Sequence, residues 1–191
     1  IREDGSLGPY DALFTWGEDA RGVHRGIDGM CLDAGDNIVA TAGHDTTSYA
    51  ITGGLLALIE NPDEMAKLRA DPSLMPSAVE EVLRYAAPVL STSRILAEDR
   101  AVGGCPMQAS QPLWMSLASA NRDPSVFNEP ERFDITQKRA GHVAFGGGAH
   151  ICIGAPLARI EARHVYLKLF ARYPALKLPP QHLVWRALPF F

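Results

Sequence analysis

The spacing of apolar residues along the chain predicts two long helices. Residues 38–60 form the first, because apolar side chains recur there at helical spacing on a single stripe. The members of that stripe are Ile51, Leu55, Leu58 and Ile59. The second helix begins near Pro156, and its predicted apolar face carries Leu157, Ile160, Leu167 and Ala171.

Two shorter helices are indicated between these by capping signals. Asn61-Pro62 ends the first long helix and begins the next, with Asn61 as N-cap and Glu64 completing a capping box. Ser77 and Glu80 stand in the same relation at the start of a helix predicted over 77–85.

Two further stretches of the chain show no helical pattern. Residues 89–118 are rich in Val, Ser, Thr, Gly and Pro, which predicts short strands with turns at Gly103-Gly104 and Gln111-Pro112. Residues 121–141 contain Asn-Arg-Asp-Pro and Glu-Pro-Glu-Arg-Phe-Asp, which is turn chemistry without regular period. The expected fold class is mainly α with small β-sheets.

Composition and charge exclude several classes of protein. The 191 residues are 47% hydrophobic and 21% charged, which is ordinary for a globular domain. A formal net charge of -4 argues against a nucleic-acid or anionic-membrane partner, and no apolar run is long enough to span a bilayer. Three widely spaced cysteines, Cys31, Cys105 and Cys152, give no disulfide framework, so a cytoplasmic location is expected.

Cys152 stands in a sequence context that suits a reactive thiolate. Three glycines, Gly146 to Gly148, precede it, and Gly154 and Pro156 lead into a helix. Glycine permits close approach of a bulky group, and a helix N-terminus stabilises a thiolate that could bind a metal. The alternatives are a buried structural cysteine or a phosphate loop, although the Gly-Lys-Ser/Thr ending of a phosphate loop is missing.

Four segments in order resemble the motifs of the cytochrome P450 family. FGGGAHICIG (145–154) resembles the haem-binding signature, and AGHDTT (42–47) the oxygen-activation motif of a long helix. Glu81 and Arg84 match the ExxR motif, and residues 121–134 resemble the meander that supplies a second arginine. The resemblance implies haem b as cofactor, with Cys152 as the iron ligand.

The resemblance also assigns residues around the haem. Arg94 and His150 would meet the propionates, Phe145 would pack against the porphyrin and shield the sulfur, and His142 could contact the haem edge. Asp45 and Thr46 match the acid–alcohol pair in which the alcohol holds dioxygen and the acid relays protons. The remaining cofactor-binding positions are Ala42, Gly43, Gly146 and Gly154.

Three charged residues are implied to support the haem site. Glu81 and Arg84 lie three apart on a helix and share a face, and the resemblance implies that Arg132 joins them. Without the other motifs, a solvated surface pair would be the better interpretation. Arg159 and Arg163 also share a helix face, which could be a solvated surface or a docking site for an electron donor.

Members of this family are considerably longer than this chain. The match is expected from about residue 28 onward, so residues 1–191 would be a partial domain that lacks the N-terminal half and the last strand. The implied function is a bacterial-type monooxygenase acting on a small organic substrate with a ferredoxin or flavodoxin-type electron donor. The alternatives are a truncated, inactive fragment or partner-binding module, and a peroxide-dependent haem-thiolate hydroxylase, against which the Asp45–Thr46 pair counts.

Overall fold

The computed structural model describes residues 30–32, 38–40, 44–137 and 141–178. The chain divides into two compact units, Ile1–Asp45 and Thr46–Phe191. In the first unit, β1 (Met30–Leu32) pairs antiparallel with β2 (Ile38–Ala40). The prediction of helix from Ile38 is therefore wrong for residues 38–40. These residues find strand partners in β1, and their β-branched Ile-Val pair favours extended backbone.

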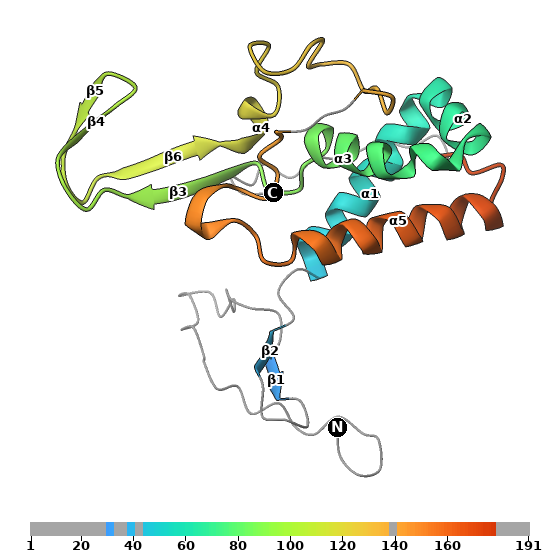
Figure 1. Ribbon diagram of the computed structural model, residues 1–191, viewed down its shortest axis with the longest axis horizontal. Helices are drawn as coiled ribbons and strands as arrows, with labels where there is room; N and C mark the ends of the chain where they lie inside the picture. The colour runs from blue at the N-terminus through green and yellow to red at the C-terminus, as the bar shows by residue number, and fades with distance from the viewer. Residues whose placement is uncertain (1–29, 33–37, 41–43, 138–140, 179–191) are drawn as a thin grey trace. The chain divides into compact units, whose positions relative to one another are not determined.

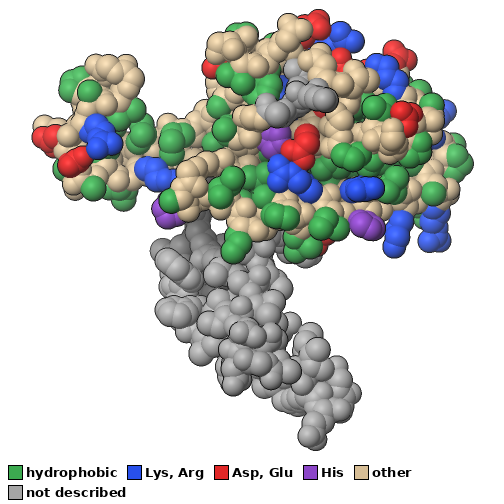
Figure 2. All heavy atoms as spheres, in the orientation of Figure 1, with side chains coloured by type: hydrophobic (Ala, Val, Ile, Leu, Met, Phe, Trp, Pro, Cys, Tyr) green, Lys and Arg blue, Asp and Glu red, His purple; other side chains and the backbone are tan. Residues whose placement is uncertain are grey.

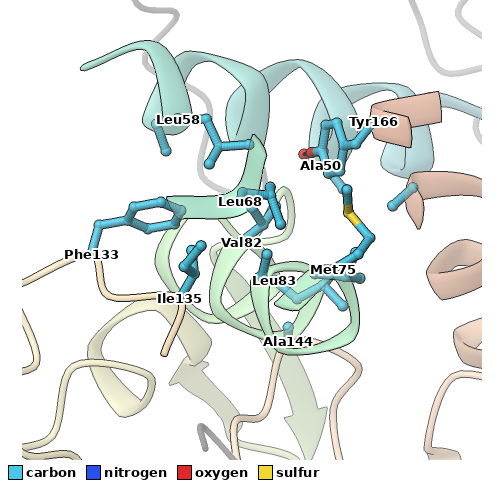
Figure 3. Close-up of a cluster of buried hydrophobic side chains, with 14 of the residues drawn as sticks. Ala50, Leu58, Leu68, Met75, Val82, Leu83, Phe133, Ile135, Ala144 and Tyr166 are labelled. Atoms are coloured by element: carbon cyan, nitrogen blue, oxygen red, sulfur yellow. Dashed lines mark hydrogen bonds between the residues drawn. The ribbon is translucent and has the colours of Figure 1, made fainter. Parts of the chain in front are cut away.

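Four helices supply most of the core of the second unit (Figure 1). They are α1 (His44–Glu60), which belongs to this unit from Thr46 onward, α2 (Pro62–Ala70), α3 (Met75–Tyr85) and α5 (Ala155–Arg172). Their facing sides bury one apolar cluster. Phe133 and Ile135, which lie in the irregular segment 121–137, also belong to this cluster (Figure 3). The predicted helices are thus confirmed from His44 onward.

The helix α1 passes very close to α3 and α5 at Gly54. A Cβ atom at this position would overlap the side chain of Val82 and the hydroxyl of Tyr166, so the approach requires glycine. The hydroxyl of Tyr166 donates a hydrogen bond to the Ile51 carbonyl at 3.0 Å. Burial raises the pKa of Tyr166, so this hydroxyl keeps its proton and remains a donor.

Neither predicted capping box is formed, although the helices begin near the predicted positions. Asn61 is the N-cap residue of α2 but makes no side-chain cap bond, and Glu64 accepts a hydrogen bond from the backbone N–H of Ile135 at 3.1 Å. The helix α3 begins at Met75, and the hydroxyl of Ser77 donates to the carbonyl of Gln137 at 3.1 Å. Partners distant in the sequence thus bind Glu64 and Ser77, while the Asn61 amide donates to the Ala57 carbonyl at 2.8 Å.

The predicted short strands are confirmed. The strands β3 (Ser91–Ile95) and β6 (Pro112–Ser116) form one antiparallel ribbon, and β4 (Arg100–Val102) and β5 (Cys105–Met107) form a second (Figure 1). Gly103 and Gly104 make the tight turn with φ values of 56° and 82°. The other turn lies slightly before the predicted Gln111-Pro112, at Ser110, whose φ is 69°.

Residues 121–137 contain no helix or strand, as the turn-rich sequence predicts. They follow α4 (Leu117–Ala120), and two single 3-10 turns, η1 (Pro72–Leu74) and η2 (Gly148–His150), complete the described elements. No helix within the described ranges is both long enough and apolar enough to cross a bilayer.

The buried face of α5 differs from the one that periodicity predicts. Ala155, Ala162 and Tyr166 are buried against the core, whereas Leu157 and Ile160 are 58% and 55% exposed. In Figure 2, apolar and basic side chains are mixed along the edge that α5 forms. The apolar residues of α5 occupy more than one face, so their spacing alone could not determine which face packs against α1 and α3.

Candidate functional site

Glu81 and Arg84 form a fully buried ion pair on α3. Arg84 donates from Nε to Glu81 Oε2 at 2.7 Å and from Nη2 to Glu81 Oε1 at 2.8 Å, and both side chains are 0% exposed. One turn of helix separates the two residues, which places them on the same face. This two-pronged geometry satisfies both charges where water cannot reach them.

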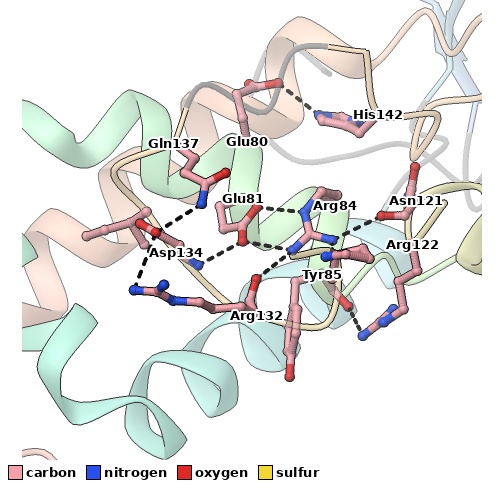
Figure 4. Close-up of polar contacts among 12 residues, drawn as sticks. Glu80, Glu81, Arg84, Tyr85, Asn121, Arg122, Arg132, Asp134, Gln137 and His142 are labelled. Carbon is pink, nitrogen blue, oxygen red and sulfur yellow. Dashed lines mark hydrogen bonds and ion pairs between the residues drawn. The ribbon is translucent and has the colours of Figure 1, made fainter. Parts of the chain in front are cut away.

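The same pair organises the irregular segment 121–134 (Figure 4). Arg84 uses its remaining N–H groups to bind three main-chain carbonyls at 2.7–3.0 Å, so that all five guanidinium donors have acceptors. Those carbonyls belong to Asn121, Pro130 and Arg132. Glu81 in turn accepts the backbone N–H of Asp134 at 2.9 Å. One buried side-chain pair therefore sets the path of a segment that has no regular secondary structure.

Arg132 is joined to this pair through its backbone. Its carbonyl accepts from Arg84 Nη2 at 3.0 Å, while its guanidinium lies 3.2 Å from Glu129 Oε2 and 3.8 Å from Asp134 Oδ2. The side chain is 53% exposed. Arg132 thus contacts the pair through a main-chain bond, which no side-chain motif could reveal.

Asn121 is a site residue that sequence reasoning missed. It is fully buried, its carbonyl accepts from Arg84, and its Oδ1 accepts the backbone N–H of Val143 at 2.7 Å. It therefore connects the buried ion pair to the start of the segment that leads to Cys152. A sequence signal existed, because Asn121 directly follows a helix and begins the Asn-Arg-Asp-Pro turn.

The loop that carries Cys152 is closed by backbone hydrogen bonds. The N–H of Cys152 donates to the carbonyl of Phe145 at 3.0 Å, and the N–H of Ile151 to that of Gly148 at 3.2 Å. Gly146 and Gly148 have φ values of 72° and 69°, in the left-handed region that glycine alone adopts readily. The loop thus folds back on itself just before α5, as the glycine run predicts.

The thiol of Cys152 is exposed and lies next to the beginning of α5. The N–H of Ala155, the first residue of α5, donates to the Cys152 carbonyl at 3.3 Å. A Cβ on Gly154 would lie 3.8 Å from the sulfur, so the chain turns closely past the thiol. The N-terminus of a helix carries a partial positive charge, and Cys152 lies directly before that of α5.

A second polar cluster brackets this loop. Glu80 receives two hydrogen bonds from Arg159, at 2.6 and 2.9 Å, and lies 2.9 Å from His142 Nε2. Burial alone would raise the pKa of Glu80, but the bonds from His142 and Arg159 and the Arg159 charge lower it to about 2. The guanidinium of Arg159 also lies over the ring of Phe145, 4.6 Å from its centroid.

Glu80 is thus the partner of two residues for which the resemblance implies other contacts. His142, expected near the haem edge, has a side chain only 3% exposed and pairs with Glu80. Arg159, considered with Arg163 as a docking face, is held by the same carboxylate, while Arg163 is exposed. Neither contact is visible in the sequence, because Glu80 lies 62 and 79 residues away from these partners.

The other predicted site residues occupy exposed or partly exposed positions. Arg94 lies on β3, where Nη1 donates to Thr92 Oγ1 at 3.2 Å and to the Ser93 carbonyl at 2.8 Å. His150 is exposed in η2, two residues before Cys152. Asp45 and Thr46 lie in the first turn of α1, the former exposed and the latter partly buried. The predicted positions Ala42 and Gly43 lie outside the described residues.

Comparison with known proteins identifies the family. The family model described as Cytochrome P450 matches residues 37–184. This chain belongs to the cytochrome P450 family. The match begins later than the expected start near residue 28.

Individual cytochromes P450 are similar over most of this chain. Cytochrome P450 107B1 of Saccharopolyspora erythraea is 45% identical over 78% of the chain, and PikC of Streptomyces venezuelae is 47% identical over 80%. The crystal structure of P450BioI in complex with a fatty-acid-loaded acyl carrier protein is 40% identical and superposes with a TM-score of 0.73 over 79% of the chain. The chain spans 38% of the length of each of these three proteins. The described elements are thus part of the cytochrome P450 fold.

The exposed loop is compatible with the cofactor of cytochromes P450, which is haem b. In this family the iron is held by a cysteine thiolate, and Cys152 is an exposed thiol at a helix N-terminus. A Cβ on Gly147 or Gly148 would have no neighbour within 4 Å, and Ile151 and Ile153 are 61% and 99% exposed. An apolar, open loop surface around a sulfur donor is what a flat, largely apolar macrocycle requires.

Proposed function

We propose that this chain is the C-terminal part of a haem-thiolate monooxygenase and that Cys152 is its iron ligand. The observation that carries the proposal is the exposed Cys152 thiol, fixed by its N–H bond to Phe145 directly before the N-terminus of α5. Bound haem would supply the redox chemistry that inserts one oxygen atom of dioxygen into a small organic substrate.

The loop residues hold and orient the cofactor. Cys152 would supply the thiolate ligand beside the first turn of α5, and Gly146 and Gly154 would let the backbone approach the ring. Phe145 would pack against the porphyrin and, together with it, shield the sulfur from water. Arg94 and His150 provide donors for the two propionates, and their exposed side chains have the freedom to turn toward an anionic group.

The first turn of α1 handles protons. The hydroxyl of Thr46 would donate a hydrogen bond to dioxygen, and the carboxyl of Asp45 would deliver protons from solvent as a general acid. The exposed position of Asp45 supports this assignment, because a proton relay needs contact with water. Ala42 and Gly43, just before this turn, are small enough to leave room beside the ring.

Glu81, Arg84 and Arg132 act as structural supports. Their bonds fix residues 121–134, and Asn121 carries that rigidity to Val143 at the entrance of the cysteine loop. The precision of a metal ligand depends on such supporting contacts, since a loop alone is free to move.

The electrons come from a redox partner, which we propose to be a ferredoxin or flavodoxin-type protein. This rests on the bacterial relatives of the chain. The substrate is a small organic molecule, and neither nucleic acid nor membrane takes part. The proposed location is the cytoplasm, in line with the spacing of the cysteines.

A second candidate is a fragment without activity of its own. The 38% coverage of the relatives favours it, as do the exposed apolar side chains on α5 and the cysteine loop. Such a fragment would leave a haem surface uncovered and would bind the cofactor weakly.

The spectrum of the reduced, carbon-monoxide-treated protein separates the two candidates. For haem-thiolate ligation we expect a thiolate-type Soret band that is lost in Cys152→Ala and kept in Cys105→Ala, the matched control at another exposed thiol. A band that persists in Cys152→Ala would disprove the ligand assignment. No haem uptake by the chain would leave the inactive fragment as the conclusion.

A further inference from the structure

Glu80 is adjacent to the ExxR glutamate but serves a different part of the molecule. Its carboxylate binds His142, which precedes the cysteine loop, and Arg159, which follows the loop on α5. The two partners lie ten residues before and seven residues after Cys152. One carboxylate on α3 therefore holds both ends of the loop, as the Glu80–His142 contact in Figure 4 shows for one end.

We propose that Glu80 is a positioning residue for Cys152. It binds His142 and Arg159, and through Arg159 it fixes the ring of Phe145. This inference rests on the proposed role of Cys152 as a ligand. It concerns a residue outside the Glu81–Arg84 support, with its own partners and its own test.

The first argument is the path of contacts from Glu80 to the ligand. Arg159 uses Nε and Nη2 on the two oxygens of Glu80, which fixes the plane of its guanidinium. That plane lies over Phe145, and the carbonyl of Phe145 accepts the N–H of Cys152. Loss of the carboxylate would release Arg159, then the Phe145 ring, and then the backbone bond to Cys152.

Few contacts restrain the part of the loop that carries the thiol. Residues 149–153 are exposed, and among the described residues the loop is otherwise held by bonds within it, by the Asn121–Val143 bond at its entrance, and by the packing of Ala144 and Phe145 against the core. A segment with few buried contacts opens locally at low free-energy cost, so a clamp at both ends has a large effect on it.

The cluster of Glu80, His142 and Arg159 is more enclosed than an ordinary surface salt bridge. The side chains of Glu80 and Arg159 are 33% and 38% exposed, and that of His142 is 3% exposed. The backbone N–H of Ala144 points at His142 Nδ1 from 3.3 Å, which assigns the proton of the neutral ring to Nε2, facing Glu80. His142 thus bridges the carboxylate to the backbone just before Phe145.

Amide hydrogen exchange of the full chain, resolved by residue with NMR, tests the proposal without haem. In Glu80→Gln we expect the Cys152 amide to exchange faster by on the order of tenfold, together with its neighbours in 143–154. Amides of the α1–α3 contact should keep the wild-type rate. The control Glu161→Gln removes an exposed carboxylate of α5 and should change neither group.

Two results would overturn the proposal. An unchanged Cys152 amide in Glu80→Gln would show that the clamp does not act on the ligand, and equal acceleration across the core would show a general structural role. If Glu80→Gln does not fold, Arg159→Lys gives the same test, because it keeps the charge but loses the two-pronged bond. The double variant Glu80→Gln/Arg159→Gln should be no worse than Glu80→Gln, because that change already releases both partners, and additive effects would count against a shared path.

This experiment is independent of the test of the proposed function. Failure of the carbon-monoxide spectrum to respond to Cys152→Ala would remove the ligand role and leave the exchange result intact. An unchanged exchange rate would remove the clamp and leave the ligand role intact.

Discussion

Two adjacent glutamates of α3, Glu81 and Glu80, lie in regions that differ in burial. Glu81 belongs to the buried ion pair with Arg84, and Glu80 to the partly exposed cluster beside the cysteine loop. Glu81 and its partner Arg84 are completely buried, and every donor of the arginine is used within the chain. Glu80 and Arg159 are about one-third exposed and serve a loop whose thiol faces outward. The first region depends on burial for its strength, since an unpaired charge there has no access to water. The second depends on a few charged contacts, which leaves it adjustable.

The largest expected effect comes from breaking the buried pair. Arg84→Met keeps roughly the length of the side chain but removes the buried cation that faces Glu81 and the donors to three main-chain carbonyls. We expect the free energy of unfolding to fall by about 3–5 kcal/mol. Urea unfolding followed by circular dichroism measures it.

The matched control for this variant is Arg100→Met. Arg100 and Glu98 form a pair in which both side chains are about two-thirds exposed, so its loss should change stability little. Equal unfolding midpoints for Arg84→Met and Arg100→Met would contradict the difference drawn between enclosed and exposed pairs.

A smaller loss is expected from overfilling the enclosed region at Gly54. In Gly54→Ala the new methyl group would overlap Val82 and the Tyr166 hydroxyl, so α1 must shift away from α3 and α5. Overpacking of this kind costs about 1–3 kcal/mol. Gly53→Ala is the control, because its Cβ would lie 3.5 Å from Ala86 in ordinary contact. Thermal unfolding should show a lower midpoint for Gly54→Ala only, and a lower midpoint for both would point to a helix effect instead.

The contribution of the Glu80–His142–Arg159 cluster to the free energy of unfolding should depend on pH. The pKa of Glu80 falls from 4.5 to about 2 on folding, so its stabilisation is complete at neutral pH and is lost as pH drops from about 5 to 2. Allowing for solvent screening, the wild type should exceed Glu80→Gln by about 1–2 kcal/mol at neutral pH. Urea unfolding of both proteins at several pH values measures the gap. A gap that does not narrow on acidification would contradict the assignment.

The smallest effect on stability is expected on the outer face of α5. Leu157 is 58% exposed, so Leu157→Gln should change the free energy of unfolding by no more than about 0.5 kcal/mol. Leu157→Gln should, however, reduce self-association measured by light scattering, because it removes an apolar side chain from the exposed surface. Ala162→Gln, at a position 2% exposed, is the contrasting control and should destabilise the chain clearly. Similar losses in both variants would mean that Leu157 is covered.

Local rules were sufficient for a large part of the fold. The spacing of Glu81 and Arg84 predicts a shared helix face, and that pair is formed, because partners one turn apart meet wherever the helix exists. Gly103-Gly104 likewise predicts the tight turn, because glycine readily adopts the positive φ that the turn requires. At residues 38–40 the local pattern failed, since strand partners six to ten residues away decided the backbone conformation.

The sequence by itself determined the family motifs, the helices and short strands, and Cys152 in a glycine loop before a helix. Only the tertiary structure decided that Arg132 contributes a carbonyl, that Asn121 bridges to Val143, and that Glu80 reaches His142 and Arg159. The physical reason is that helix and turn geometry follow from neighbours within a few residues. The partners of a buried carbonyl or a half-buried carboxylate depend instead on how whole elements pack, as the buried face of α5 also does.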